Sequence, residues 1–203
     1  MNIQDFPYIK LDIPDGSLEV RIEAFYSING KDKTLTHVRQ VAKTNALIAG
    51  EFNLDPGKSI LAGLLHDISA VMRPNDMLLY AKTCDMELDE SERRHPFLLH
   101  QRLSRVFAET IFSVRDTDVL SAIECHTTLK TGPSKYDMSL FVADKLSWDQ
   151  EGKPPFYSQV KLALSNSLES ACLEYINYMM ENALLQYPHK WLLESKAFLE
   201  TQV

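Results

Sequence analysis

The chain has 203 residues, of which 45% are hydrophobic and 24% are charged, a composition typical of one globular domain. Its formal net charge of −7 argues against broad nucleic-acid binding, which needs a basic face, although a metal or a few local cations can still hold a phosphorylated small molecule. No apolar stretch approaches the roughly 20 residues of a membrane span, and the start, MNIQDFPYIK, lacks the basic and apolar regions of a secretory signal.

Residues 1–17 contain Asp, Pro and Gly without clear periodicity, and we expect an N-terminal arm there. From Ser17 onward, apolar residues recur at intervals of three and four, which is the helical spacing, and no segment alternates convincingly with the period of two that marks a strand. We therefore expect an all-α fold with one helical domain over residues 18–203. Its helices are expected near 17–28, 32–52, 55–67, 74–83, 96–111, 116–126, 137–148, 156–187 (either continuous or broken near Asn166) and 188–200.

The segments between these helices carry two further expectations. Residues 84–95 are acidic and then basic, and we expect a connector in which Ser91–Arg94 forms a solvated face. The three cysteines, at 84, 125 and 172, form no CxxC pair, which fits a reducing cytoplasm without a disulfide framework. Cys125 precedes His126, but adjacent helical residues do not face each other, so we expect a buried structural thiol rather than a nucleophile.

Six imidazole and carboxylate side chains lie on apolar helix faces or at helix ends, from which separate helices can direct them at one point. They are His37, His66, Asp67, His100, His126 and Asp144. A mixed nitrogen and oxygen donor set suits Fe, Mn, Co or Zn better than Mg or Ca. Six ligands with one bridging carboxylate would be enough for a pair of metal ions that activates water and holds a phosphate oxygen.

Each of these residues alone has a plainer interpretation. A lone buried histidine is more often a hydrogen-bonded core residue than a ligand, and a single buried aspartate such as Asp144 can pair with Arg or Lys. Six such residues on apolar helices favour a common site instead. His95 follows two arginines and is expected to be exposed, and His189 follows a proline and is expected to start a helix, so both are left outside the site.

The order His, His-Asp, His, His, Asp and the sequences that flank these residues resemble those of a known family. The matching segments are LTHVRQVAKTNALIAGEFNLDPGKSILAGLLHDIS, FLLHQRLS, AIECHTTLKTGPS and LFVADKLSWDQ. They resemble the HD-domain metal-dependent phosphohydrolases, and within these the bacterial YqeK-type enzymes that hydrolyse diadenosine tetraphosphate symmetrically to two ADP. The resemblance covers roughly residues 20–200.

The resemblance implies an all-helical HD-domain bundle with a metal site between helices and hydrolysis by metal-activated water. The six residues above would bind one or two transition-metal ions per chain, with iron favoured and Mn, Co or Zn as alternatives. Asp67 would bridge the ions, and Asp67, His100 and His126 would be the catalytic residues. The loop after His126 would hydrogen-bond phosphate oxygens through Thr127, Thr128 and Lys130. The expected partners are the dinucleotide and its ADP product in the cytoplasm, with no nucleic acid and no membrane, and the apolar helix surface is compatible with a homodimer.

The chain also departs from the family pattern. Many HD enzymes have a lysine three residues after the Asp of the dipeptide, where this chain has Ala70. Arg73 or Lys145 could supply the missing charge. Two alternatives therefore stay open: an HD phosphohydrolase acting on another nucleotide or phosphate ester, and a nucleotide-binding or sensing module with weak turnover.

Overall fold

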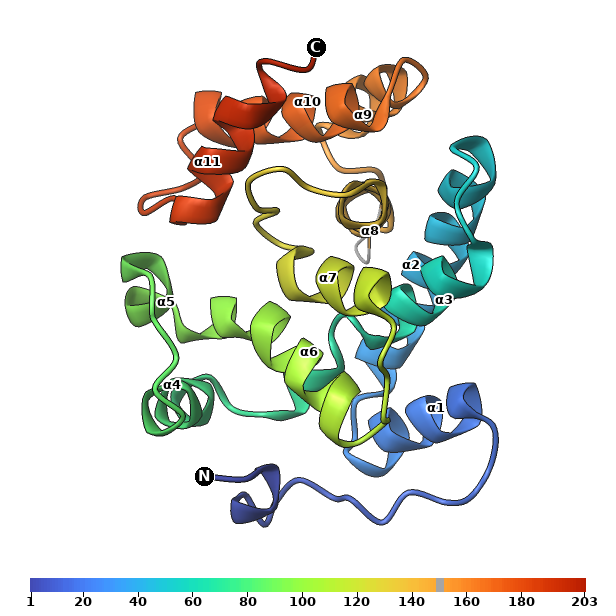
Figure 1. Ribbon diagram of the computed structural model, residues 1–203, viewed down its shortest axis with the longest axis vertical. Coiled ribbons are helices and arrows are strands. Elements are labelled where there is room, and N and C mark those ends of the chain that lie inside the picture. The colour runs from blue at the N-terminus through green and yellow to red at the C-terminus, as the bar shows by residue number, and fades with distance from the viewer. Residues whose placement is uncertain (149–151) are drawn as a thin grey trace.

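The computed structural model describes residues 1–148 and 152–203, and over these residues all regular secondary structure is helical, as expected (Figure 1). The α-helices are α1 (Leu18–Ile28), α2 (Asp32–Glu51), α3 (Pro56–Leu65), α4 (Pro74–Thr83), α5 (Glu90–Arg94), α6 (His100–Thr110), α7 (Thr117–Cys125), α8 (Lys135–Leu146), α9 (Tyr157–Leu164), α10 (Leu168–Glu181) and α11 (Lys190–Leu199). Short 3-10 helices are η1 (Ile3–Asp5), η2 (Ile68–Val71) and η3 (Pro96–Leu99). The expected helix over 156–187 is thus broken near Asn166, into α9 and α10.

Local chemistry sets several of the helix starts. The Asp55 side chain accepts hydrogen bonds from the backbone of Gly57 and Lys58, and Pro56 occupies the first turn of α3. Asp116 caps α7 in the same way. Ser134 caps α8 with a reciprocal capping box, so this helix begins two residues earlier than the apolar spacing alone predicts.

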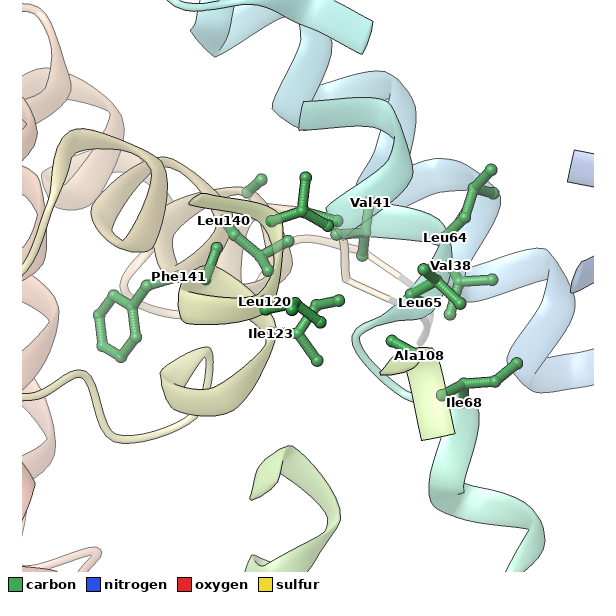
Figure 2. Close-up of a cluster of buried hydrophobic side chains, with 14 of the residues drawn as sticks. Val38, Val41, Leu64, Leu65, Ile68, Ala108, Leu120, Ile123, Leu140 and Phe141 are labelled. Carbon is green, nitrogen blue, oxygen red and sulfur yellow. The ribbon is translucent and has the colours of Figure 1, made fainter. Parts of the chain in front are cut away.

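The core lies where α2, α3, α7 and α8 pack together, with α6 alongside. Figure 2 shows apolar side chains that these helices and η2 contribute to this region. The labelled ones are Val38, Val41, Leu64, Leu65, Ile68, Ala108, Leu120, Ile123, Leu140 and Phe141, and all are buried. Burial of such side chains stabilises the fold by roughly 1.5–3 kcal/mol each.

The α2–α3 crossing is especially close because α3 presents a glycine to α2. A Cβ atom added at Gly63 would lie 2.5 Å from the Ala42 Cα atom and 2.8 Å from the Ala42 nitrogen. Only a residue without a side chain fits there. The close crossing brings the end of α3 against the middle of α2, and this placement positions the histidines described below.

A buried polar bridge ties α2 to both of its neighbours. Asn45 on α2 donates to the Ser59 carbonyl of α3 at 2.8 Å and accepts from the Ser139 hydroxyl of α8 at 2.5 Å. All three residues are buried, so breaking the bridge would leave polar groups unpaired at a cost of roughly 1–3 kcal/mol. The bridge therefore holds three of the helices that carry the candidate site in one arrangement.

The N-terminal segment packs on α4, and the C-terminal helices pack on α8. The N-terminal residues expected to form an arm include buried Ile3, Phe6 and Ile9, and the Tyr8 hydroxyl donates to Asp76 of α4 at 2.6 Å. At the other end, α10 packs on α8, and α11 packs on α10 (Figure 1). None of the helices in the described part of the chain has the length and apolar character to cross a membrane.

The prediction of a solvated face at Ser91–Arg94 is wrong for its first half. Asp89 caps α5 with a capping box, which buries Ser91 and Glu92. The Glu92 carboxylate lies 3.0 Å from the Arg102 guanidinium on α6. Burial alone would raise the pKa of Glu92, but its hydrogen bonds and the Arg102 charge outweigh burial and hold that pKa below its usual value.

Candidate metal centre

The structure brings together all six residues predicted as ligands. They come from the second turn of α2 (His37), the end of α3 and the turn after it (His66, Asp67), the start of α6 (His100), the end of α7 (His126) and α8 (Asp144). The side chains of His66, His100 and His126 are at least 90% buried, whereas those of Asp67 and Asp144 are 20% and 17% exposed. The three imidazoles therefore form the buried side of the cluster, and the two carboxylates remain accessible to solvent.

Two groups of potential ligand atoms share one carboxylate. The ligand atoms of His37, His66 and Asp67 lie within 4.8 Å of one another, and so do those of Asp67, His100 and His126. The Asp144 Oδ1 atom lies 3.0 Å from the His37 Nε2 atom and 3.6 Å from the His66 Nε2 atom. Asp67 is the residue common to both groups of potential ligands.

Hydrogen bonds at three helix ends orient the buried histidines. In each case the Nδ1 atom contacts the backbone carbonyl three residues earlier: His66 to Gly63 at 2.8 Å, His100 to Phe97 at 2.6 Å and His126 to Ile123 at 2.8 Å. A carbonyl can only accept, so Nδ1 carries the proton and Nε2 presents a lone pair. This is the arrangement in which proteins hold metal-binding imidazoles.

The Nε2 atoms of these three histidines lie in an arrangement that a bound cation would stabilise. The Nε2 atoms of His100 and His126 are only 2.9 Å apart, and the buried Nε2 atom of His66 has no hydrogen-bond partner. Facing lone pairs repel unless a proton or a metal ion lies between them. Burial lowers the pKa of His100, and burial together with the neighbouring histidines lowers that of His126 much further, so a proton shared between these two is unfavourable. Burial alone would also lower the pKa of His66, but Asp67 and Asp144 raise it above its ordinary value, so His66 is the one of the three that can hold a proton on Nε2 when no metal is bound. The donor set fits a transition-metal ion, which binds neutral imidazole.

Lys145 orients the carboxylate that completes the first group. Its ammonium lies 2.6 Å from the Asp144 Oδ2 atom, which leaves Oδ1 facing the two histidines. Burial alone would raise the pKa of Asp144, but the Lys145 charge and the histidine hydrogen bonds hold it well below its ordinary value. Asp144 is therefore ionised near neutral pH. Arg73, the other residue considered as a substitute for the missing lysine, instead lies over the Tyr8 ring at 4.3 Å.

The three residues predicted to bind substrate have different surroundings. The Thr127 hydroxyl lies 3.2 Å from the His100 Nε2 atom, at the centre. The buried Thr128 hydroxyl is bonded to Gln101, and the Lys130 ammonium contacts Ser121 at 2.6 Å. Of these three side chains, the structure thus directs only that of Thr127 toward the metal-facing atoms.

Gln101 is a residue that the sequence interpretation missed. It is fully buried, and its Oε1 atom accepts hydrogen bonds from the backbone of Thr127 at 3.0 Å and of Thr128 at 3.2 Å. It therefore fixes the turn that carries Thr127. Its only sequence signal is a polar residue beside His100, which is too common to be informative.

The other histidine and cysteine predictions can be checked directly. His95 is exposed, and His189 caps the start of α11, as expected. Cys125 is buried, as expected, and its burial raises the pKa of the thiol well above the ordinary value, which disfavours the thiolate.

Comparison with known proteins gives the same picture. The HD domain family matches residues 34–149. An uncharacterized protein in the pepC 5′ region of Lactococcus lactis subsp. cremoris is 40% identical over 150 residues, covering 74% of this chain and 76% of that protein. The symmetrical bis(5′-nucleosyl)-tetraphosphatase of Halalkalibacterium halodurans is 24% identical over 172 residues, covering 81% and 88%.

A solved structure has the same fold. It is described as a predicted HD superfamily hydrolase involved in NAD metabolism from Clostridium acetobutylicum, and it aligns with a TM-score of 0.79 at 24% identity over 90% of this chain and 96% of that one. The family match itself extends over more than half of the chain and contains all six residues of the cluster. The chain therefore belongs to the HD domain family, and it is a phosphohydrolase of that family.

Proposed function

We propose that this protein hydrolyses dinucleoside polyphosphates in a metal-dependent reaction, cleaving diadenosine tetraphosphate to two ADP. The observation that carries the proposal is the paired ligand groups that share Asp67, with three imidazole Nε2 atoms aimed at the same space. Two motifs, HTT at 126–128 and FVAD at 141–144, support the choice of substrate, because they resemble the symmetrical hydrolases. The named tetraphosphatase of H. halodurans supports it as well.

The proposed ligands are His37, His66, Asp67, His100, His126 and Asp144, holding one or two ions, with iron favoured. A transition metal bound there supplies Lewis acidity toward water and phosphate oxygens. Among the chain's own groups, Thr127 offers a hydroxyl beside His100, and Lys145 places a positive charge next to Asp144. Both can hold the polyphosphate near Asp67. Asp67, His100 and His126 are the proposed catalytic residues.

The products of the reaction test this proposal. Protein purified with its native metal should convert diadenosine tetraphosphate and one water molecule to ADP alone, whereas asymmetric cleavage would give ATP and AMP. His126→Ala should abolish turnover. His95→Ala is the matched control, because His95 is exposed and outside the cluster, and it should leave turnover unchanged. Intact substrate after incubation with metal-loaded protein would contradict the proposal.

A second candidate is an HD phosphohydrolase acting on another nucleotide or phosphate ester. Ala70 favours it, because the residue found there in many HD enzymes is a lysine that could contact phosphate. Efficient cleavage of another member of a nucleotide panel, with diadenosine tetraphosphate left intact, would identify this alternative.

A further inference from the structure

A cavity of about 110 Å³ lies beside the metal centre. Its walls come from the turn after α7, from α8 and α10, and from the connector between α10 and α11 and the start of α11. Figure 1 shows α10 and α11 on the same side of α8, next to the loop that follows α7.

Two residues belong both to this cavity and to the metal centre. Thr127 lines the cavity, and its hydroxyl is 3.2 Å from the His100 Nε2 atom. Lys145 also lines the cavity, and its ammonium is 2.6 Å from the Asp144 Oδ2 atom. A group bound in the cavity would therefore be separated from the ligand atoms by a single hydroxyl and a single ammonium. Both are groups that bind phosphate oxygens.

Most of the remaining walls have the opposite chemistry, although Thr128 and His189 add two further polar side chains. Tyr175, Met179, Leu185, Tyr187 and Leu192 present aromatic and apolar surface. Apolar walls with a few polar groups at one end are typical of a site that takes a flat organic group and orients it by a polar substituent. Its volume of about 110 Å³ is less than the roughly 150 Å³ of a closed cavity that holds benzene, but the cavity is open on one side, so an inserted flat ring need not fit wholly within it.

We infer that this cavity binds one nucleobase of the nucleotide substrate and determines base specificity, with the attached phosphates passing Thr127 and Lys145 toward the metal centre. The inference rests on the proposed function for the nature of the substrate. Tyr175 and Tyr187 supply aromatic surface to the cavity, and Leu185 lines it from the connector. The cavity takes a single base, so only one half of a dinucleotide is held in this way.

Two neighbouring leucines provide a matched pair of variants. Leu185 lines the cavity and is half-buried, whereas Leu184 is 54% exposed and is not among the lining residues. Leu185→Trp should fill the cavity, and Leu184→Trp adds the same side chain outside it. Calorimetry on the protein purified with its native metal measures binding of ADP, which carries the base, and of inorganic tripolyphosphate, which does not.

We expect Leu185→Trp to weaken ADP binding by about tenfold, which is the usual contribution of a base stacked on protein rings, and to leave tripolyphosphate binding unchanged. Leu184→Trp should change neither. Should Leu185→Trp not fold, Tyr187→Ala removes a 44% exposed wall residue and should weaken ADP binding selectively too. Unchanged ADP binding, or an equal loss for ADP and tripolyphosphate, would overturn the inference.

This experiment separates the inference from the proposed reaction. Selective loss of ADP binding in a protein that does not cleave diadenosine tetraphosphate would support the base cavity and reject the reaction. Symmetric cleavage by a protein whose ADP binding ignores Leu185→Trp would support the reaction and reject the base cavity.

Discussion

The close crossing of α2 and α3 makes Gly63→Ala a stringent test of how the fold positions the site. The added Cβ would lie 2.5 Å, 2.8 Å and 3.0 Å from the Cα, nitrogen and Cβ atoms of Ala42. Carbon atoms pack at roughly 3.5–4.0 Å, so the helices must separate by about 1 Å. No flexible side chain can move aside, because the nearest atoms are backbone.

Overpacking of this kind costs about 1–3 kcal/mol, and a clash with backbone belongs at the upper end, near 3 kcal/mol. For a chain of this size the midpoint of thermal unfolding should fall by roughly 6–12 °C. The Gly63 carbonyl also orients His66, so metal affinity should fall with stability.

Urea and thermal unfolding of Gly63→Ala and Gly50→Ala measure the effect against a matched control. Gly50 lies near the end of α2, and a Cβ there meets no atom within 4 Å. That substitution should leave stability unchanged or raise it by up to about 1 kcal/mol, because alanine is the better helix former. A Gly63→Ala variant within about 0.5 kcal/mol of wild type would refute the reasoning about this crossing.

Three further predictions concern other parts of the molecule. Because the folded-state pKa of Glu92 lies below its ordinary value, the stability that its carboxylate contributes is complete above about pH 4.3 and is lost as the pH falls through the folded-state pKa. Glu92→Gln should therefore lower the free energy of unfolding in urea by roughly 3 kcal/mol at pH 7 and by clearly less at pH 3. An equal loss at the two pH values would contradict this. A thiol reagent should modify Cys84 quickly in the native protein and reach Cys125 and Cys172 only after denaturation, since burial raises the pKa of both; three fast thiols would disprove the packing. Lys145→Met should lower metal affinity or kcat by about 10–100-fold while the fold, monitored by circular dichroism, persists, and wild-type values for both would show that its ammonium has no positioning role.

Much of the fold follows from the helical period and from capping residues. The helical spacing of apolar residues places α2, α3 and α7 within two residues of their observed bounds. The period is uninformative for α5, which is too short to show one. Asp89 and Glu92 form a capping box there, and that pattern was the available signal.

The candidate site was partly predictable. Residue type and position on apolar helices single out the six members of the cluster, but spacing along the chain cannot show that they converge, because five separate segments contribute them. The direction of the Lys130 side chain could not be predicted, because it depends on the backbone conformation of the preceding residue. Leu129 adopts a left-handed φ of 55°, and the chain turns there so that the Lys130 ammonium contacts Ser121 of α7.

Tertiary packing also decides which of the two candidate substitutes for the missing lysine lies at the site. Arg73 precedes α4 and stacks on the N-terminal segment through Tyr8. Lys145 follows Asp144 on α8, and its ammonium reaches the outer oxygen of that carboxylate. Only the packing of the chain ends and of α8 distinguishes them.

The metal content of natively purified protein tests the central claim most directly. Elemental analysis of wild type, Asp67→Ala and His95→Ala should find one or two transition-metal ions per chain in wild type and in His95→Ala, and strongly reduced metal in Asp67→Ala, because Asp67 belongs to both ligand groups. A metal-free wild-type protein that still hydrolyses phosphoanhydride bonds, or full metal occupancy in Asp67→Ala, would contradict the account.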